Sequence, residues 1–134
     1  MDVTRQRTKV DFAHFMKEVA GKMYPNAKRI HVIMDNLNTH NESSFIKAFG
    51  KREGLRIWSR FVPHYTPKHA SWLNIAENEI SVLSKQCLNR RIDSEEKLKQ
   101  ETRAWCAKRN RSRVLVRWTF TREKAREKFP ELYA

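Results

Sequence analysis

The sequence has few cysteines and no long apolar segment, and each shortage excludes a class of protein. Its two cysteines, Cys87 and Cys106, lack the spacing of a metal-binding pair and are too few for a disulfide framework. We interpret both as small core residues in a reducing compartment. No run of about 18 apolar residues predicts a transmembrane helix, and no apolar segment near the N-terminus predicts a secretory signal.

Acidic residues are also scarce, because 15 Asp and Glu stand against 28 Lys and Arg. The formal net charge is +13, while 40% hydrophobic residues and four tryptophans among 134 residues favour one globular domain over disorder. A basic chain can simply be soluble. Here the cations are clustered, which favours nucleic acid as a partner, since neutralised phosphates release counterions. The densest cluster comprises Lys108, Arg109, Arg111, Arg113 and Arg117.

The first third of the chain has a helix pattern followed by a strand pattern. Thr8 and Asp11 have the spacing of a capping box, and apolar residues recur behind them at helical intervals as far as Gly21, which we expect to end the helix. The apolar run Ile30–Met34 predicts a buried strand.

A second helix–strand unit follows. Asn41 is the expected cap of a helix that ends at Gly50 or Gly54. The segment Arg56–Val62 has strand composition, and Pro63 is expected to stop it. Two strands separated by a helix predict an α/β fold with parallel pairing.

The second half of the sequence is mainly helical. A long helix is expected from Ser71 to Leu88, and another is expected to start at Asp93 or Ser94 and to reach about Lys108. The tail contains a strand-like run at 114–118 and a short helix capped by Thr121. The apolar face of the long helix is formed by Trp72, Ala76, Ile80, Leu83 and Cys87.

Carboxylates occur where a metal site would need them. Asp35 follows the first strand, and ligands of α/β folds gather at the carboxyl ends of strands. Glu77 and Glu79 lie early in the long helix. Two or three acids from different elements suffice for Mg²⁺, which assists phosphoryl transfer on nucleic acids. The alternatives are a turn or cap role for Asp35 and solvated helix-dipole partners for the two glutamates.

Three strings carry a resemblance to a known family: "IHVIMDNLNTHN", "FVPHYTPKHASWLNIAENEIS" and "CLNRRI". They resemble the C-terminal part of bacterial insertion-sequence transposases of the mariner superfamily, which have a ribonuclease H-like, retroviral-integrase-like catalytic core. In this resemblance Asp35 matches the second acid of the DDE triad and Glu77 the third. Asn36, Asn38, Thr39 and His40 would form the polar rim of the site. On a helical wheel Glu79 lies nearer the apolar face than Glu77, so it also stays a candidate.

The resemblance implies Mg²⁺ or Mn²⁺ as cofactor and double-stranded DNA as partner, in the bacterial cytoplasm at the nucleoid and away from membranes. Lys68 beside the site is the strongest candidate for a phosphate contact, and His64 and His69 are expected to bond locally or to approach phosphates rather than bind zinc. The expected nucleic-acid-binding residues are His40, Lys68, His69, Arg90 and Arg91.

The family places its first Asp on a strand upstream of the helix that begins near Thr8. We therefore expect residues 1–134 to form a single partial domain without the first three strands, with a core part over about 1–92 and a helical, basic part over about 93–134. This predicts a transposase core that cleaves and joins DNA but is inactive as this fragment and self-associates. The alternative is a non-catalytic DNA-binding or oligomerisation remnant.

Overall fold

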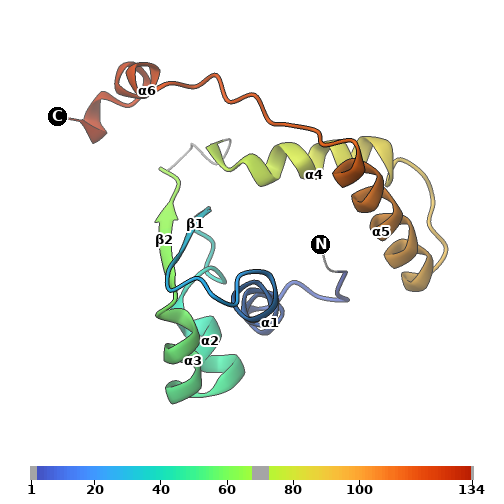
Figure 1. The fold of residues 1–134 in the computed structure, drawn as a ribbon, viewed down its shortest axis with the longest axis horizontal. Coiled ribbons are helices and arrows are strands. Elements are labelled where there is room, and N and C mark those ends of the chain that lie inside the picture. Colours follow the sequence, from blue (N-terminus) through green and yellow to red (C-terminus); the bar gives the residue numbers. More distant parts are fainter. Residues whose placement is uncertain (1–2, 68–72, 134) are drawn as a thin grey trace.

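The computed structural model describes residues 3–67 and 73–133 (Figure 1). Its helices surround or extend from a small parallel sheet of two strands, so the predicted α/β class is confirmed at that level. The elements are α1 (Lys9–Glu18), the π-helical turn η1 (Val19–Met23), β1 (Ile30–Met34), α2 (Glu42–Phe49), α3 (Lys51–Trp58), β2 (Phe61–Tyr65), α4 (Ile75–Gln86), α5 (Glu95–Arg111), α6 (Arg122–Lys128) and the 3₁₀ turn η3 (Pro130–Leu132).

The first helix begins as the sequence predicts, and at Glu18 α1 passes into the π-helical turn η1. The Thr8 hydroxyl accepts a hydrogen bond from the Asp11 amide, and the Asp11 carboxylate accepts one from the Thr8 amide, which completes the capping box. The prediction that Gly21 ends the helix is wrong. The chain continues through η1, whose wider turn closes when the Tyr24 amide donates to the Val19 carbonyl at 2.9 Å.

The strand prediction for Ile30–Met34 is confirmed, and so is its parallel pairing. The second strand was predicted too early, at Arg56–Val62. Arg56, Ile57 and Trp58 instead finish helix α3, and β2 runs from Phe61 to Tyr65 with Pro63 inside it. Pro63 is tolerated because β2 has one strand neighbour among the described residues, so its missing N–H interrupts no second ladder.

The core lies between one face of the sheet and helices α1, α2 and α3. Phe45 of α2 is completely buried at its centre, with the Trp58 ring at 5.1 Å and the Phe61 ring at 5.9 Å. Ala13 and Met16 reach the same cluster from α1. Gly50, with a φ of 77°, separates α2 from α3 and lets the two helices pack side by side.

Helices α4 and α5 form a second unit that projects from the sheet (Figure 1). Asn74 caps α4, which ends at Gln86 rather than at Leu88, and the predicted start at Ser71 lies outside the described residues. Ser94 caps α5, which continues beyond Lys108 to Arg111. Leu83 and Cys87 are buried on the predicted apolar face of α4, whereas Ile80 is 54% exposed. Trp72 belongs to the undescribed segment.

The tail after α5 turns back along α4 toward the sheet and ends in α6 (Figure 1). Thr121 caps α6 as predicted. The prediction of a strand at 114–118 is wrong, since this segment is extended but pairs with no strand in the described part of the chain, and Leu115 is 84% exposed. Among the described residues, no helix is both long and apolar enough to cross a membrane.

Candidate active site at the carboxyl end of β1

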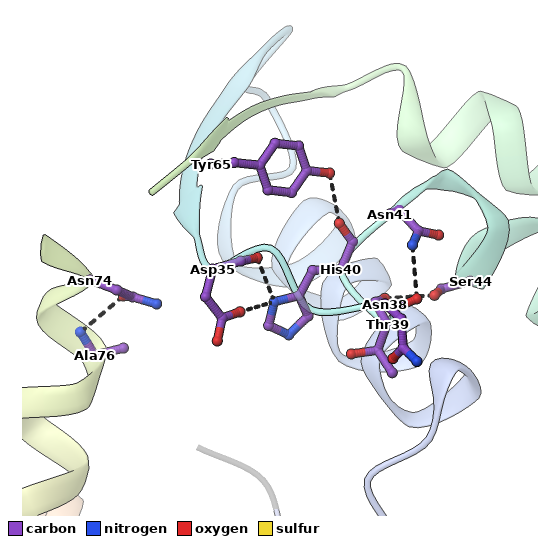
Figure 2. A network of polar contacts seen from close by, with 9 residues as sticks. All are labelled: Asp35, Asn38, Thr39, His40, Asn41, Ser44, Tyr65, Asn74 and Ala76. Atoms are coloured by element: carbon purple, nitrogen blue, oxygen red, sulfur yellow. Dashed lines mark hydrogen bonds and ion pairs between the residues drawn. The ribbon is translucent and has the colours of Figure 1, made fainter. Parts of the chain in front are cut away.

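Asp35 directly follows β1, and its carboxylate faces His40 (Figure 2). Asp35 Oδ1 lies 2.6 Å from His40 Nδ1, which is also 3.3 Å from the Asp35 backbone carbonyl. The short carboxylate contact lacks the alignment of a hydrogen bond. Oδ1 is therefore buried without a hydrogen-bond partner among the described residues, although the Asp35 side chain as a whole is 28% exposed. A buried carboxylate oxygen without an aligned hydrogen bond keeps a lone pair for a further partner, here beside the His40 contact.

His40 is held from three sides. The Tyr65 hydroxyl at the end of β2 donates to the His40 carbonyl at 2.7 Å. The Phe12 ring from α1 lies 4.7 Å from the imidazole ring, and the His40 amide donates to the Leu37 carbonyl at 2.9 Å. These contacts fix the imidazole beside Asp35. The structure places His40 against Asp35, and its predicted contact with nucleic acid stays a prediction.

The loop between Asp35 and α2 is fixed through its backbone (Figure 2). The Asn38 carbonyl accepts from Asn41 Nδ2 at 2.8 Å, and the Thr39 carbonyl accepts from the buried Ser44 hydroxyl at 2.6 Å. The Asn41 side chain also caps α2, as predicted, by accepting from the Ser43 amide at 3.0 Å. The loop is thus anchored to the start of α2, and this anchoring also holds the backbone of His40 in place.

The two glutamates of α4 have different surroundings. Glu77 is exposed, and its carboxylate makes no hydrogen bond or ion pair with the described part of the chain. Glu79 accepts two hydrogen bonds from Arg109 of α5, at 2.6 and 2.7 Å. These hydrogen bonds lower the pKa of the Glu79 carboxyl below its ordinary value and raise the pKa of Arg109. Glu79 therefore joins α4 to α5, and Glu77 is free to bind a ligand.

The start of α4 lies across a cavity of about 590 Å³ from β1. Ile33 of β1 and Asn74 and Ala76 of α4 line it, and in Figure 2 Asn74 lies on the side of Asp35 away from His40. Within residues 3–67 and 73–133, no three His, Cys, Asp or Glu side chains gather closely enough to hold an ion. The described residues thus form no metal cluster of three ligands, and the joint role of Asp35 and Glu77 stays a prediction.

The family assignment agrees with this location. A family model described as DDE superfamily endonuclease matches residues 1–99. The chain belongs to the DDE superfamily endonucleases. No curated protein and no solved structure matches it significantly. The matched region contains the sheet, Asp35, both glutamates of α4 and the first residues of α5, so the family indicates a transposase-type nuclease.

Two of the residues predicted to bind DNA in this endonuclease, Arg90 and Arg91, already have acidic partners. Arg90 forms an ion pair with Glu101 of α5, and Arg91 lies 3.7 Å from Asp93. Lys68 and His69 lie outside the described residues. The two arginines therefore already have acidic partners, which an approaching phosphate would have to displace.

Sequence reasoning gave Tyr65 and Phe12 no role at the site. A correct second strand would have identified Tyr65. In the parallel register Met34 pairs with Tyr65, which places this side chain next to Asp35. Placing the second strand too early concealed that relation. Phe12 was recognised only as part of the apolar face of α1, and no sequence pattern pairs it with His40.

Arg109→Ala is expected to loosen α5 from α4 in this endonuclease. The Trp105 indole N–H donates to Gln86 at 2.9 Å across the same helix pair, and the Arg109 guanidinium lies over the Trp105 ring, so the indole NMR signal reports both the helix separation and this contact. At neutral pH the variant's signal should move toward that of an exposed indole. In the unaltered chain this movement should occur only as pH falls below 4.5, the ordinary pKa of a glutamate, because a lowered pKa means that the contact is lost by protonation of Glu79.

The matched control is Arg103→Ala, since Arg103 is an exposed arginine of the same helix without an acidic partner among the described residues. It should leave the Trp105 signal and its pH dependence unchanged. Equal behaviour of the two variants would show that the Glu79–Arg109 pair does not hold the helices together.

Proposed function

We propose that this DDE superfamily endonuclease is the catalytic core of a bacterial insertion-sequence transposase of the mariner type. It cleaves and joins double-stranded DNA by phosphoryl transfer that depends on Mg²⁺ or Mn²⁺. The observation that carries the proposal is the buried Oδ1 of Asp35 at the carboxyl end of β1, which contacts His40 Nδ1 without an aligned hydrogen bond and lies within the region that matches the family. A ribonuclease H-like core, of which β1 and β2 are two strands, is part of the same proposal.

The residues present fit a hard divalent cation. Asp35 offers a carboxylate oxygen without a competing hydrogen bond, and Glu77 offers an exposed carboxylate without a partner among the described residues. Mg²⁺ takes one or two carboxylates and keeps several waters, so these two acids would hold it. When bound, such a cation activates the attacking oxygen and stabilises the leaving one.

The neighbouring side chains position the Asp35 carboxylate. His40 restricts it from one side, and Tyr65 and Phe12 restrict His40. We assign His40 this positioning role in addition to its predicted contact with DNA. Lys68, His69, Arg90 and Arg91 remain the proposed contacts to phosphates around the site.

A further acid is needed for a complete DDE triad. Because no group of three ligands exists within the described residues, we propose that these 134 residues alone have little cleavage or joining activity. The same observation favours a second candidate function, a non-catalytic DNA-binding or oligomerisation module. Self-association is consistent with β1, which has one strand neighbour in the described part of the chain and carries an Ile33 that is 63% exposed.

Asp35→Asn is expected to abolish Mn²⁺ binding at the end of β1. The substitution keeps the size of the side chain and removes the charge that the ion needs. In the unaltered chain, paramagnetic Mn²⁺ should broaden the amide NMR signals of residues near Asp35 first. His40→Ala should weaken binding by about 10- to 100-fold, the usual effect of losing a group that orients a metal ligand.

Glu77→Gln and Glu79→Gln form the matched pair for this titration. The first should weaken Mn²⁺ binding, and the second should not, because Glu79 is bonded to Arg109. Unchanged broadening in Asp35→Asn would overturn the proposed site. Incubation with supercoiled plasmid then distinguishes a catalytic core from a non-catalytic module. Nicking that is lost in Asp35→Asn would show that a working site assembles. Metal binding without nicking would support an incomplete triad.

A further inference from the structure

Two histidines face each other on the side of the sheet opposite the core. His31 of β1 and His64 of β2 are both exposed, and neither belongs to the Asp35 site. His31 pairs in register with Val62, and His64 with Ile33, so the two histidines are diagonal neighbours on one face. His31 Nδ1 lies 2.8 Å from His64 Nε2, and the rings are stacked at 16° with their centroids 5.1 Å apart.

We propose that His31 and His64 form a binding site for a late first-row transition-metal ion, Ni²⁺ or Cu²⁺. Imidazole nitrogens suit these borderline metals, whereas the carboxylates at the end of β1 suit Mg²⁺ and Mn²⁺. The site would hold the ion between Nδ1 of His31 and Nε2 of His64. It is independent of the proposed function, because none of its residues takes part in phosphoryl transfer.

The nitrogen separation selects the metal geometry. With metal–nitrogen bonds of about 2.0 Å, two ligands at a right angle stand about 2.8 Å apart, and two tetrahedral ligands stand about 3.3 Å apart. The observed 2.8 Å therefore fits the right-angled pair of a tetragonal Cu²⁺ or Ni²⁺ site better than tetrahedral Zn²⁺. The two facing nitrogens now point at each other, so each exposed ring would turn by about 45° to bring both lone pairs onto one ion at a right angle.

Binding needs no loss of a proton from the neutral pair. One ring now holds the hydrogen between the two facing nitrogens. On metal binding this hydrogen leaves that nitrogen and is replaced by one on the outer nitrogen of the same ring, so the ring changes tautomer and both facing lone pairs become available. No third His, Cys, Asp or Glu completes a cluster within the described residues, so water would fill the remaining positions.

The ion would join the two strands across the exposed face of the sheet. The strand backbones already hold the two rings in place, so little ordering is needed on binding. A ligand that binds the folded chain and not the unfolded one raises its thermal stability. The predicted consequence is a metal-dependent stabilisation of the sheet that carries Asp35 at its carboxyl end.

The test is a titration of the untagged chain with NiCl₂ by calorimetry at about pH 7.5, where free imidazole is neutral. One Ni²⁺ ion per chain is expected to bind at this site, more tightly than Zn²⁺, and to raise the melting temperature. His31→Ala and His64→Ala should each weaken binding by about tenfold or more, since even outer groups of metal sites have that effect. His14→Ala is the control, because His14 packs edge-on against the Phe49 ring and faces no other histidine among the described residues.

Electron paramagnetic resonance of bound Cu²⁺ gives a second readout that needs no variant. A spectrum with coupling to two imidazole nitrogens supports the site, and His31→Ala should reduce it to one. Coupling to fewer than two nitrogens in the unaltered chain would overturn the proposal, even if a variant failed to fold. It would also be overturned if His31→Ala and His14→Ala bound Ni²⁺ alike, or if Zn²⁺ bound more tightly than Ni²⁺.

Discussion

Raising the salt concentration from about 50 to 200 mM is expected to weaken the binding of this chain to duplex DNA by about 10³- to 10⁵-fold. The reason is the formal net charge of +13, which favours contacts to several phosphates and the release of their counterions. Fluorescence anisotropy with a labelled duplex of random sequence, repeated at several salt concentrations, measures the slope. A flat response would contradict binding dominated by phosphates.

The structure distinguishes cations that are free from cations that are already paired. In the cluster at the end of α5, Arg109 is bonded to Glu79, whereas Lys108, Arg111 and Arg117 are exposed and have no acidic partner within the described residues. Arg90 is paired with Glu101. We infer that the free cations at the end of α5 contribute more to DNA affinity than cations that already have an acidic partner.

Two triple variants test this inference at equal charge, because each removes three positive charges. Replacing the free cations should reduce the slope of log affinity against log salt by about 0.9 per lost phosphate contact, and replacing the paired ones should reduce it less. Equal losses would show that only net charge matters. The free set is Lys108→Ala, Arg111→Ala and Arg117→Ala, and the paired set is Arg5→Ala, Arg56→Ala and Arg90→Ala.

Local chemistry explains why much of the fold was predictable from the sequence. Helix caps depend on residues two or three positions apart, so Thr8, Asn41 and Thr121 cap the helices that they were predicted to cap. Ser94, one of two predicted candidates, caps α5. The strand before Asp35 was predictable because a short apolar run between polar loops is typical of a buried strand. The position of Asp35 at the strand end follows from that run.

The errors arose where distant residues decide the outcome. The apolar residues of Arg56–Val62 fit a strand, but Gly54, Ile57 and Phe61 also have helical spacing, and packing against α2 selects the helix as far as Trp58. Glu79 was predicted to need a partner or a metal, and its partner Arg109 lies on another helix. No local pattern identifies such a pair. The predicted proximity of Asp35 and Glu77 depends equally on the packing of α4.

Gly54→Ala is expected to cause a large loss of stability. Gly54 was predicted as a possible end of a helix, but it lies inside α3, at its closest approach to α2. A Cβ atom there would lie 2.6 Å from both the carbonyl carbon and the carbonyl oxygen of Phe45, which are backbone atoms and cannot turn away. The helices would have to separate around the buried Phe45 side chain. Overpacking of this kind costs about 1–3 kcal/mol or more of the free energy of unfolding.

Gly21→Ala is the matched control for this substitution. A Cβ atom at Gly21 would meet nothing within 4 Å, so this variant should be neutral or more stable by about 0.4–1 kcal/mol, through the reduced entropy of its unfolded chain. Urea unfolding followed by circular dichroism measures both variants. Since a domain of this kind has about 5–15 kcal/mol in total, Gly54→Ala should lower the unfolding midpoint clearly. Similar midpoints for the two variants would mean that α2 and α3 do not pack as closely at Phe45 as the structure indicates. The anchoring of the Asp35 loop to α2 would then be in doubt as well.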